Sequence, residues 1–187
     1  MTRQNISPQY RNLSPCLADI GNIAKLMANA SASKQSTQRG DNMLHIKGVG
    51  SHNPGDCAIQ ALTNCFQTPY RDNLELSRRL FGYPASSSGG VDFEKYNSWL
   101  ITTAKQVCTF NGVRGCVWVR SRVDDSKAKR YTERVTLGQW LRQPIAKNGS
   151  WIVAIRGHVF AVVDGVICDN YLPSQKCVMI AAYKMKD

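Results

Sequence analysis

Cys57 is the side chain whose neighbours best suit nucleophilic chemistry. It follows the turn signal Pro54-Gly55 and precedes apolar residues at helical spacing, so we predict that it lies in the first turn of a helix. Asp56 is suited to be the N-cap of that helix. Unpaired backbone N–H groups at a helix N-terminus favour a thiolate, the reactive form of cysteine. The competing interpretation is a small buried side chain, the usual role of cysteine, and we assign that role to Cys65.

A reactive thiolate requires a base, and histidine suits this role because its pKa lies near neutral pH. The chain has 3 histidines. His45 and His52 precede the predicted helix in a segment typical of a loop, whereas His158 lies in an otherwise apolar run that predicts a strand. A buried imidazole needs partners for its ring nitrogens, because burial without them is costly. We therefore predict His158 as the base.

A predicted hairpin brings an acid beside His158. Asp164-Gly165, between two apolar runs, is a two-residue signal for a type I′ turn. The resulting pairing makes Asp169 the diagonal neighbour of His158 on the same face of the strands. Asn170 points to the other face, and it becomes the better candidate only if a longer turn or a bulge shifts the register. We therefore predict that Asp169 orients the imidazole.

Helices are predicted in the first part of the compact domain. The helix at Cys57 is followed by a second, which Thr68-Pro69 begins and Gly82 ends, and by a third that begins at Asp92. The apolar side chains that these two helices should turn toward the core are Leu74, Leu80, Phe81, Phe93, Tyr96, Trp99 and Leu100.

Short runs rich in β-branched and aromatic residues follow Lys105 and predict strands. These runs are "VCTF", "CVWVRSRV", "WIVAIRGHVFAVV", "VICDNY" and "KCVMIAAY". A short helix between them begins at Thr136 and stops at Pro144. Helices first and strands after predict an α+β domain, in which a helical half with the nucleophile at a helix N-terminus packs on a C-terminal antiparallel sheet.

The compact domain is predicted to span 44–187. Before it, apolar residues over 13–27 recur every three or four positions, which predicts one amphipathic helix, and the small polar residues of 29–42 are typical of a linker. We therefore assign 1–43 to an N-terminal helix and linker. Three roles are open for this segment: a pro-segment, a packaging or interaction tail, and a helix that docks on a partner.

Composition limits the class of protein. The chain of 187 residues is 43% hydrophobic and 20% charged, which is typical of a folded domain. Its 7 cysteines include no CxxC pair, so neither a disulfide framework nor a zinc finger fits. We expect no cofactor and no metal, because a site built from His45, His52, Cys57 and Cys65 matches no standard spacing. The absence of a signal peptide and of a membrane-length apolar run predicts a reduced cytoplasmic protein without a membrane partner.

A formal net charge of +11, from 24 Lys and Arg against 13 Asp and Glu, favours acidic partners. The densest basic cluster, 119–135, also holds acidic residues, so we interpret it as a solvated loop, with a binding surface as the alternative. Nucleic acid is a further open partner but is not favoured, because the tryptophans are predicted on inward faces, where core packing explains them. They are Trp99, Trp118, Trp140 and Trp151.

The stretches "GDCAIQALT" and "TLGQWLRQ…GSWIVAIRGHVFAVVDGVICDN" resemble a group of small papain-like cysteine peptidase homologues of bacteriophages and bacteria. The likeness covers residues 50–171, most of the compact domain. It implies a papain-like fold with Cys57 as nucleophile, His158 as base and Asp169 as orienting acid. It also implies the host cytoplasm as the location if the chain is encoded by a phage.

The predicted oxyanion hole departs from the papain pattern. Ser51 stands where papain has a glutamine, six residues before the nucleophile. Asn53 and His52 can each donate a hydrogen bond beside the Cys57 backbone N–H, and we favour Asn53.

Two functional hypotheses follow. The first is a cysteine hydrolase that cleaves a peptide, isopeptide or other amide bond through a thioester on Cys57, with acyl transfer to another amine as a variant. Its partner would be a protein or peptide substrate. The second is a catalytically silent papain-like scaffold that binds an acidic host protein or nucleic acid through its basic surface.

Overall fold

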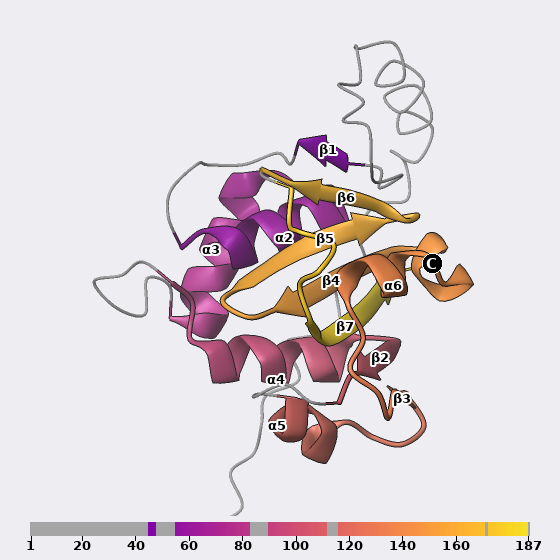
Figure 1. Cartoon of the computed structure of the whole chain (residues 1–187). Helices are drawn as coiled ribbons and strands as arrows, with labels where there is room; N and C mark the ends of the chain where they lie inside the picture. Colours follow the sequence, from indigo (N-terminus) through magenta and orange to yellow (C-terminus); the bar gives the residue numbers. More distant parts are fainter. Residues whose placement is uncertain (1–44, 48–54, 83–89, 112–115, 171, 187) are drawn as a thin grey trace, which may run out of the picture. The chain divides into compact units, whose positions relative to one another are not determined.

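The structure, a computed structural model, describes residues 45–47, 55–82, 90–111, 116–170 and 172–186 (Figure 1). All of them belong to one compact unit, Asn42–Asp187. The helix predicted over 13–27 and the linker predicted over 29–42 lie outside the described residues, so the division into 1–43 and 44–187 stays a prediction. None of the described helices has the length and hydrophobicity needed to cross a membrane.

Three of the helices begin or end at residues that the sequence marks. The described helices are α2 (Cys57–Phe66), α3 (Tyr70–Phe81), α4 (Phe93–Thr103), α5 (Cys116–Arg122), α6 (Leu137–Leu141) and the 3-10 helix η2 (Pro144–Lys147). Asp92 caps α4 by accepting a 3.0 Å hydrogen bond from the Lys95 backbone N–H. Thr136 and Gln139 form a capping box on α6. Gly82 ends α3 with a φ of 65°, a backbone conformation that favours glycine.

The strands of the described residues form one sheet of seven strands in the order β1-β6-β5-β4-β7-β2-β3. They are β1 (His45–Lys47), β2 (Gln106–Thr109), β3 (Ala128–Arg130), β4 (Ser150–Ile155), β5 (His158–Val163), β6 (Val166–Asp169) and β7 (Met179–Lys186). The neighbours β6, β5, β4, β7 and β2 pair antiparallel, as predicted. Both edge strands pair in parallel, β1 with β6 and β3 with β2, so the sheet is mixed and the prediction of an antiparallel sheet is wrong at its edges.

The long apolar run predicted as one strand around His158 forms two. Gly157, with a φ of 75°, turns the chain between β4 and β5, and Ile155 then pairs with His158. The predicted β5–β6 hairpin is confirmed: its turn residues Asp164 and Gly165 have φ values of 49° and 82°, which suit a type I′ turn. His158 is therefore the first residue of a strand rather than an interior one.

The basic cluster 119–135 is not one loop, because it holds the end of α5 and all of β3, but most of its side chains are exposed to solvent, as predicted. The run "CVWVRSRV" forms α5, although its β-branched residues favour strands, because Cys116 and Val119 lie one turn apart and are both buried. Tertiary packing of that face overrides local propensity. The following residues form β3, where Arg130 pairs with Asp125 at 2.5 Å.

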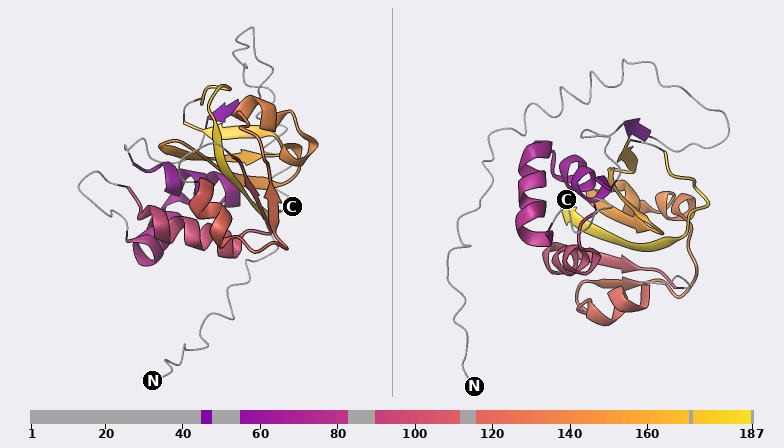
Figure 2. Two further views of the ribbon diagram at one scale, coloured as in Figure 1. Left: turned by 60° about the horizontal axis from the view of Figure 1, so that its bottom comes forward. Right: turned by 90° about the vertical axis from the view of Figure 1, so that its left-hand side faces the viewer.

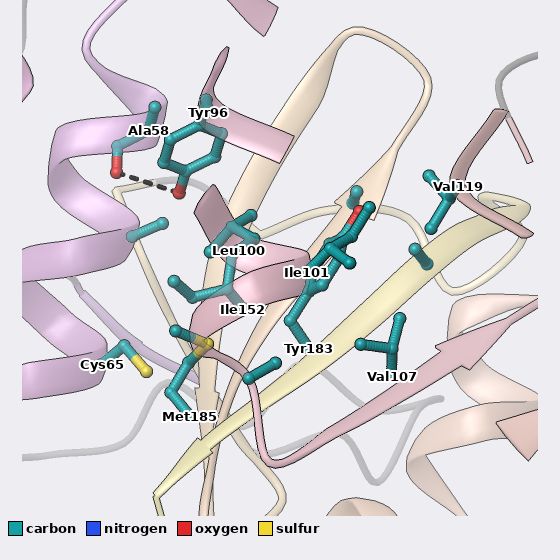
Figure 3. Close-up of a cluster of buried hydrophobic side chains, with 14 of the residues drawn as sticks. Ala58, Cys65, Tyr96, Leu100, Ile101, Val107, Val119, Ile152, Tyr183 and Met185 are labelled. Atoms are coloured by element: carbon teal, nitrogen blue, oxygen red, sulfur yellow. Dashed lines mark hydrogen bonds between the residues drawn. The ribbon is translucent and has the colours of Figure 1, made fainter. Parts of the chain in front are cut away.

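The sheet has a hydrophobic core on each face. Figure 2 shows α2, α3 and α4 on one side of the sheet and α6 on the other. On the first side, Leu100 of α4 packs with Ile152 and Tyr183 of the sheet (Figure 3). On the second side, Trp140 and Trp151 are fully buried and meet edge to face. The described helices and strands therefore form an α+β domain.

Three of the side chains predicted to face the core do not fill it as expected. Phe93 is 52% exposed, so its predicted inward position is wrong. Trp99 and Trp118 are only partly buried and pack at the margin of the first core.

Candidate active site

Cys57 is the first residue of α2, as the sequence predicts, and its side chain is half-buried. Asp56 occupies the N-cap position, but its side chain does not cap the helix. The Asp56 carboxylate is fully buried and accepts a 2.5 Å hydrogen bond from the Tyr70 hydroxyl of α3. The predicted capping bond is therefore wrong, because Tyr70 supplies a donor that the local sequence does not reveal.

His158 reaches Cys57 from the start of β5. The two side chains are hydrogen bonded, and the backbone N–H groups of Ala58 and Val159 also contact the Cys57 sulfur. The His158 ring stacks on Phe160, with 5.6 Å between ring centroids. The helix N-terminus and the first residues of β5 thus enclose the sulfur.

Asp169, the last residue of β6, holds the other side of the His158 ring. Its Oδ2 lies 2.6 Å from His158 Nε2, and its side chain is 3% exposed. Its Oδ1 accepts a 2.8 Å hydrogen bond from the Asn170 backbone N–H. Both carboxylate oxygens therefore have donors, and the structure brings Cys57, His158 and Asp169 together as the hairpin register predicts.

The electrostatics of Cys57 and His158 favour a charged pair. Burial raises the pKa of the Cys57 thiol, but hydrogen bonds from His158 and the Val159 backbone outweigh it, so the pKa lies below its ordinary value of 9.0. Burial lowers the pKa of His158, but the hydrogen bonds with Asp169 and Cys57 outweigh it and raise the pKa from 6.5 to about 9. The two directions agree, since a lowered thiol pKa and a raised imidazole pKa both favour the charged pair over the neutral one.

Two residues of α2 that the sequence analysis did not single out connect the helix to β6. Gln60 Oε1 accepts a hydrogen bond from Asn170 Nδ2, and Asn64 Nδ2 donates to the Cys168 carbonyl. The Asn170 side chain therefore points toward α2, and Asp169 is the residue that holds the His158 ring, as predicted. Polar residues three and seven positions after Cys57, on the same helix face, were the signal that could have identified Gln60 and Asn64.

Asn53, the predicted oxyanion donor, and His52, its alternative, lie outside the described residues. Cys65 is 2% exposed and packs in the first core, as predicted. Within the part of the chain that the structure describes, no three His, Cys, Asp or Glu side chains gather as metal ligands would.

No family model, no curated protein and no solved structure matches this chain in the three comparisons.

Proposed function

We propose that this protein is a papain-like cysteine hydrolase that cleaves a peptide, isopeptide or other amide bond in a protein or peptide substrate. The observation that carries the proposal is the unbroken contact from the Cys57 thiol through the His158 ring to the Asp169 carboxylate. These residues come from a helix N-terminus and two strands, and each has the chemistry that its role in thiol hydrolysis requires. A purely structural role gives no reason for this combination.

The positions of the three groups suggest the order of steps. Asp169 holds His158 Nε2, which leaves Nδ1 to exchange a proton with the Cys57 thiol. The thiolate attacks the amide carbonyl, the imidazolium protonates the leaving amine, and an acyl thioester remains on Cys57. Water then attacks the thioester while His158 accepts its proton, which releases the acid and restores the thiol. An amine in place of water would complete acyl transfer by the same steps.

The backbone supplies part of the charge stabilisation. Cys57 is the first residue of α2, where backbone N–H groups lack partners within the helix. The Cys57 N–H is therefore suited to donate to the oxyanion that forms during attack. Asn53 stays the proposed side-chain donor.

A thiol-directed probe tests the proposal. We expect an electrophilic peptide probe at neutral pH to label Cys57 faster than Cys65, since the Cys65 side chain is buried in the core. Cys57→Ala should abolish this faster labelling and His158→Ala should slow it at least about tenfold, whereas Cys65→Ala should leave it unchanged.

Labelling of Cys57 that is no faster than that of Cys65, or that ignores loss of His158, would refute the hydrolase proposal. It would leave the silent scaffold that binds an acidic host protein or nucleic acid. The net charge of +11 predicts that such binding weakens steeply with salt.

A further inference from the structure

The face of α2 that carries Cys57 also carries two buried amide side chains. Gln60 is 6% exposed and Asn64 is 9% exposed, and both are surrounded on the helix by buried apolar residues such as Ile59 and Leu62. A buried amide is tolerated only when it is hydrogen bonded, and apolar residues of similar size would pack here without that requirement. The two amides therefore point to a role beyond filling the core.

Gln60 and Asn64 bind the same strand at different points. Gln60 Oε1 accepts a 2.5 Å hydrogen bond from Asn170 Nδ2, and Asn64 Nδ2 donates a 3.3 Å bond to the Cys168 carbonyl. Gln60 thus contacts the residue that follows the acid, and Asn64 contacts the main chain before it. Both bonds join β6 to the helix that carries the nucleophile, but only the bond of Gln60 ends on a residue that itself binds the Asp169 carboxylate.

The end of β6 is where such a bond matters for the site. In the β5–β6 ladder, the first pair is Val163 with Val166 and the last is Ala161 with Cys168. Asp169 therefore lies one residue beyond the ladder. On its other side, β6 pairs with β1, in which Lys47 is opposite Asp169. On the side that faces β5, the end of β6 is therefore held by contacts other than the β5–β6 ladder.

Asn170 transmits the restraint to the carboxylate. Its side chain is held by Gln60, while its backbone N–H donates 2.8 Å to Asp169 Oδ1. The other oxygen, Oδ2, lies 2.6 Å from His158 Nε2. Contacts run from α2 through Gln60, Asn170 and Asp169 to His158, and from His158 back to Cys57 on the same helix.

We propose that Gln60 and Asn170 are a positioning pair, which aims the Asp169 carboxylate at the His158 ring by tying the end of β6 to the helix that carries Cys57. Neither residue is required to touch substrate. This inference rests on the proposed function, because it assigns the pair to the orientation of the same three groups. Among the described residues, the titratable groups that act on His158 are Cys57 from α2 and Asp169 from β6.

The test compares two substitutions on the same helix face. Gln60→Met keeps the length of the side chain but removes the acceptor for Asn170, whereas Asn64→Leu removes an equally buried amide whose partner is a backbone carbonyl. The readouts are the titration midpoint of the His158 ring by NMR and the urea midpoint of unfolding. We expect Gln60→Met to lower the His158 pKa by about one, a tenfold change in the proton equilibrium, and Asn64→Leu to leave it unchanged. Both should lower stability.

Asn170→Ala checks the other half of the pair. It should lower the His158 pKa as Gln60→Met does, and the double variant should add no further change, because the two side chains act through one bond. If Gln60→Met does not fold, Asn170→Ala carries the same prediction.

Three outcomes separate the inference from the proposed function. An unchanged His158 pKa in both Gln60→Met and Asn170→Ala would overturn the positioning pair alone. An equal drop in Asn64→Leu would also overturn it, because general loosening of the interface would then explain the effect. A wild-type His158 that titrates near its ordinary value of 6.5 instead of about 9 would instead refute the charged pair on which the proposed function depends.

Discussion

Replacing Asp169 by Asn tests the electrostatics of the site most directly. The two carboxylate oxygens receive different donors, His158 Nε2 at 2.6 Å and the Asn170 backbone N–H at 2.8 Å. An asparagine has a single acceptor atom in its side chain, so it can satisfy only one of these donors and must turn its own N–H₂ toward the other. Asp169→Asn therefore removes a negative charge and also disturbs the orientation of the ring.

The size of the effect follows from what acts on His158. Its pKa is raised from 6.5 to about 9 against the effect of burial, and both Asp169 and Cys57 contribute to the rise through a hydrogen bond and through charge. The hydrogen bond with Asp169 is the largest of the contributions that raise it, so Asp169→Asn should lower the His158 pKa by about one or more. The fraction of protonated ring at alkaline pH should then fall about tenfold.

NMR titration of the histidine rings measures this change, with His158→Ala used to assign the signal. Asp125→Asn is the matched control, because it removes a carboxylate that pairs with Arg130 in the basic segment, and it should leave His158 unchanged. A His158 pKa in Asp169→Asn that equals that of the wild type would refute the argument that the carboxylate sustains the charged pair.

Further predictions concern pH, the turn and the core. Hydrolysis should decline as pH rises through about 9, where His158 loses its proton, and a rate profile that stays flat to pH 10 would contradict this. Folding raises the pKa of His158, so the stability that the protonated His158 contributes should be complete below pH 6.5 and lost as pH rises through about 9. The urea midpoint of the wild type should therefore fall over this range by more than the urea midpoint of His158→Ala. Gly165→Ala should lower the free energy of unfolding by about 1 kcal/mol, because Gly165 has a φ of 82° that disfavours alanine. The added Cβ meets Lys147 only at ordinary contact distances, from 3.4 Å, so no clash should add to this cost, and chemical denaturation measures it. Leu100→Ala should cost about 2–5 kcal/mol by the same measurement, since Leu100 is fully buried, and a cost under about 1 kcal/mol would show that the core collapses around the cavity.

The relation of His158 to Asp169 could be predicted from the sequence because a two-residue turn fixes it. Asp164 and Gly165 both adopt positive φ, as the type I′ turn requires, and once Val163 pairs with Val166 every later pair in the hairpin is set. The helix starts at Asp92 and Thr136 were predictable for a similar reason, since a cap acts on backbone groups within three residues.

The contacts that join distant parts of the chain could not be predicted in this way. The Tyr70 hydroxyl that captures Asp56, and the Gln60 amide that binds Asn170, depend on how α3 and β6 pack against α2. Likewise, "CVWVRSRV" has the composition of a strand but forms α5, because burial of one helical face on the first core outweighs its local preference.

The sequence by itself determined the chemical types at the site, the helix start that bears Cys57 and the register that aligns His158 with Asp169, because turns and caps act through backbone geometry over a few residues. Only the tertiary structure decided that α2 lies against β5 and β6, so that the thiol meets the ring. It also decided the parallel edges of the sheet. Such contacts depend on burying apolar surface from segments far apart in the chain, and no short stretch of sequence encodes that.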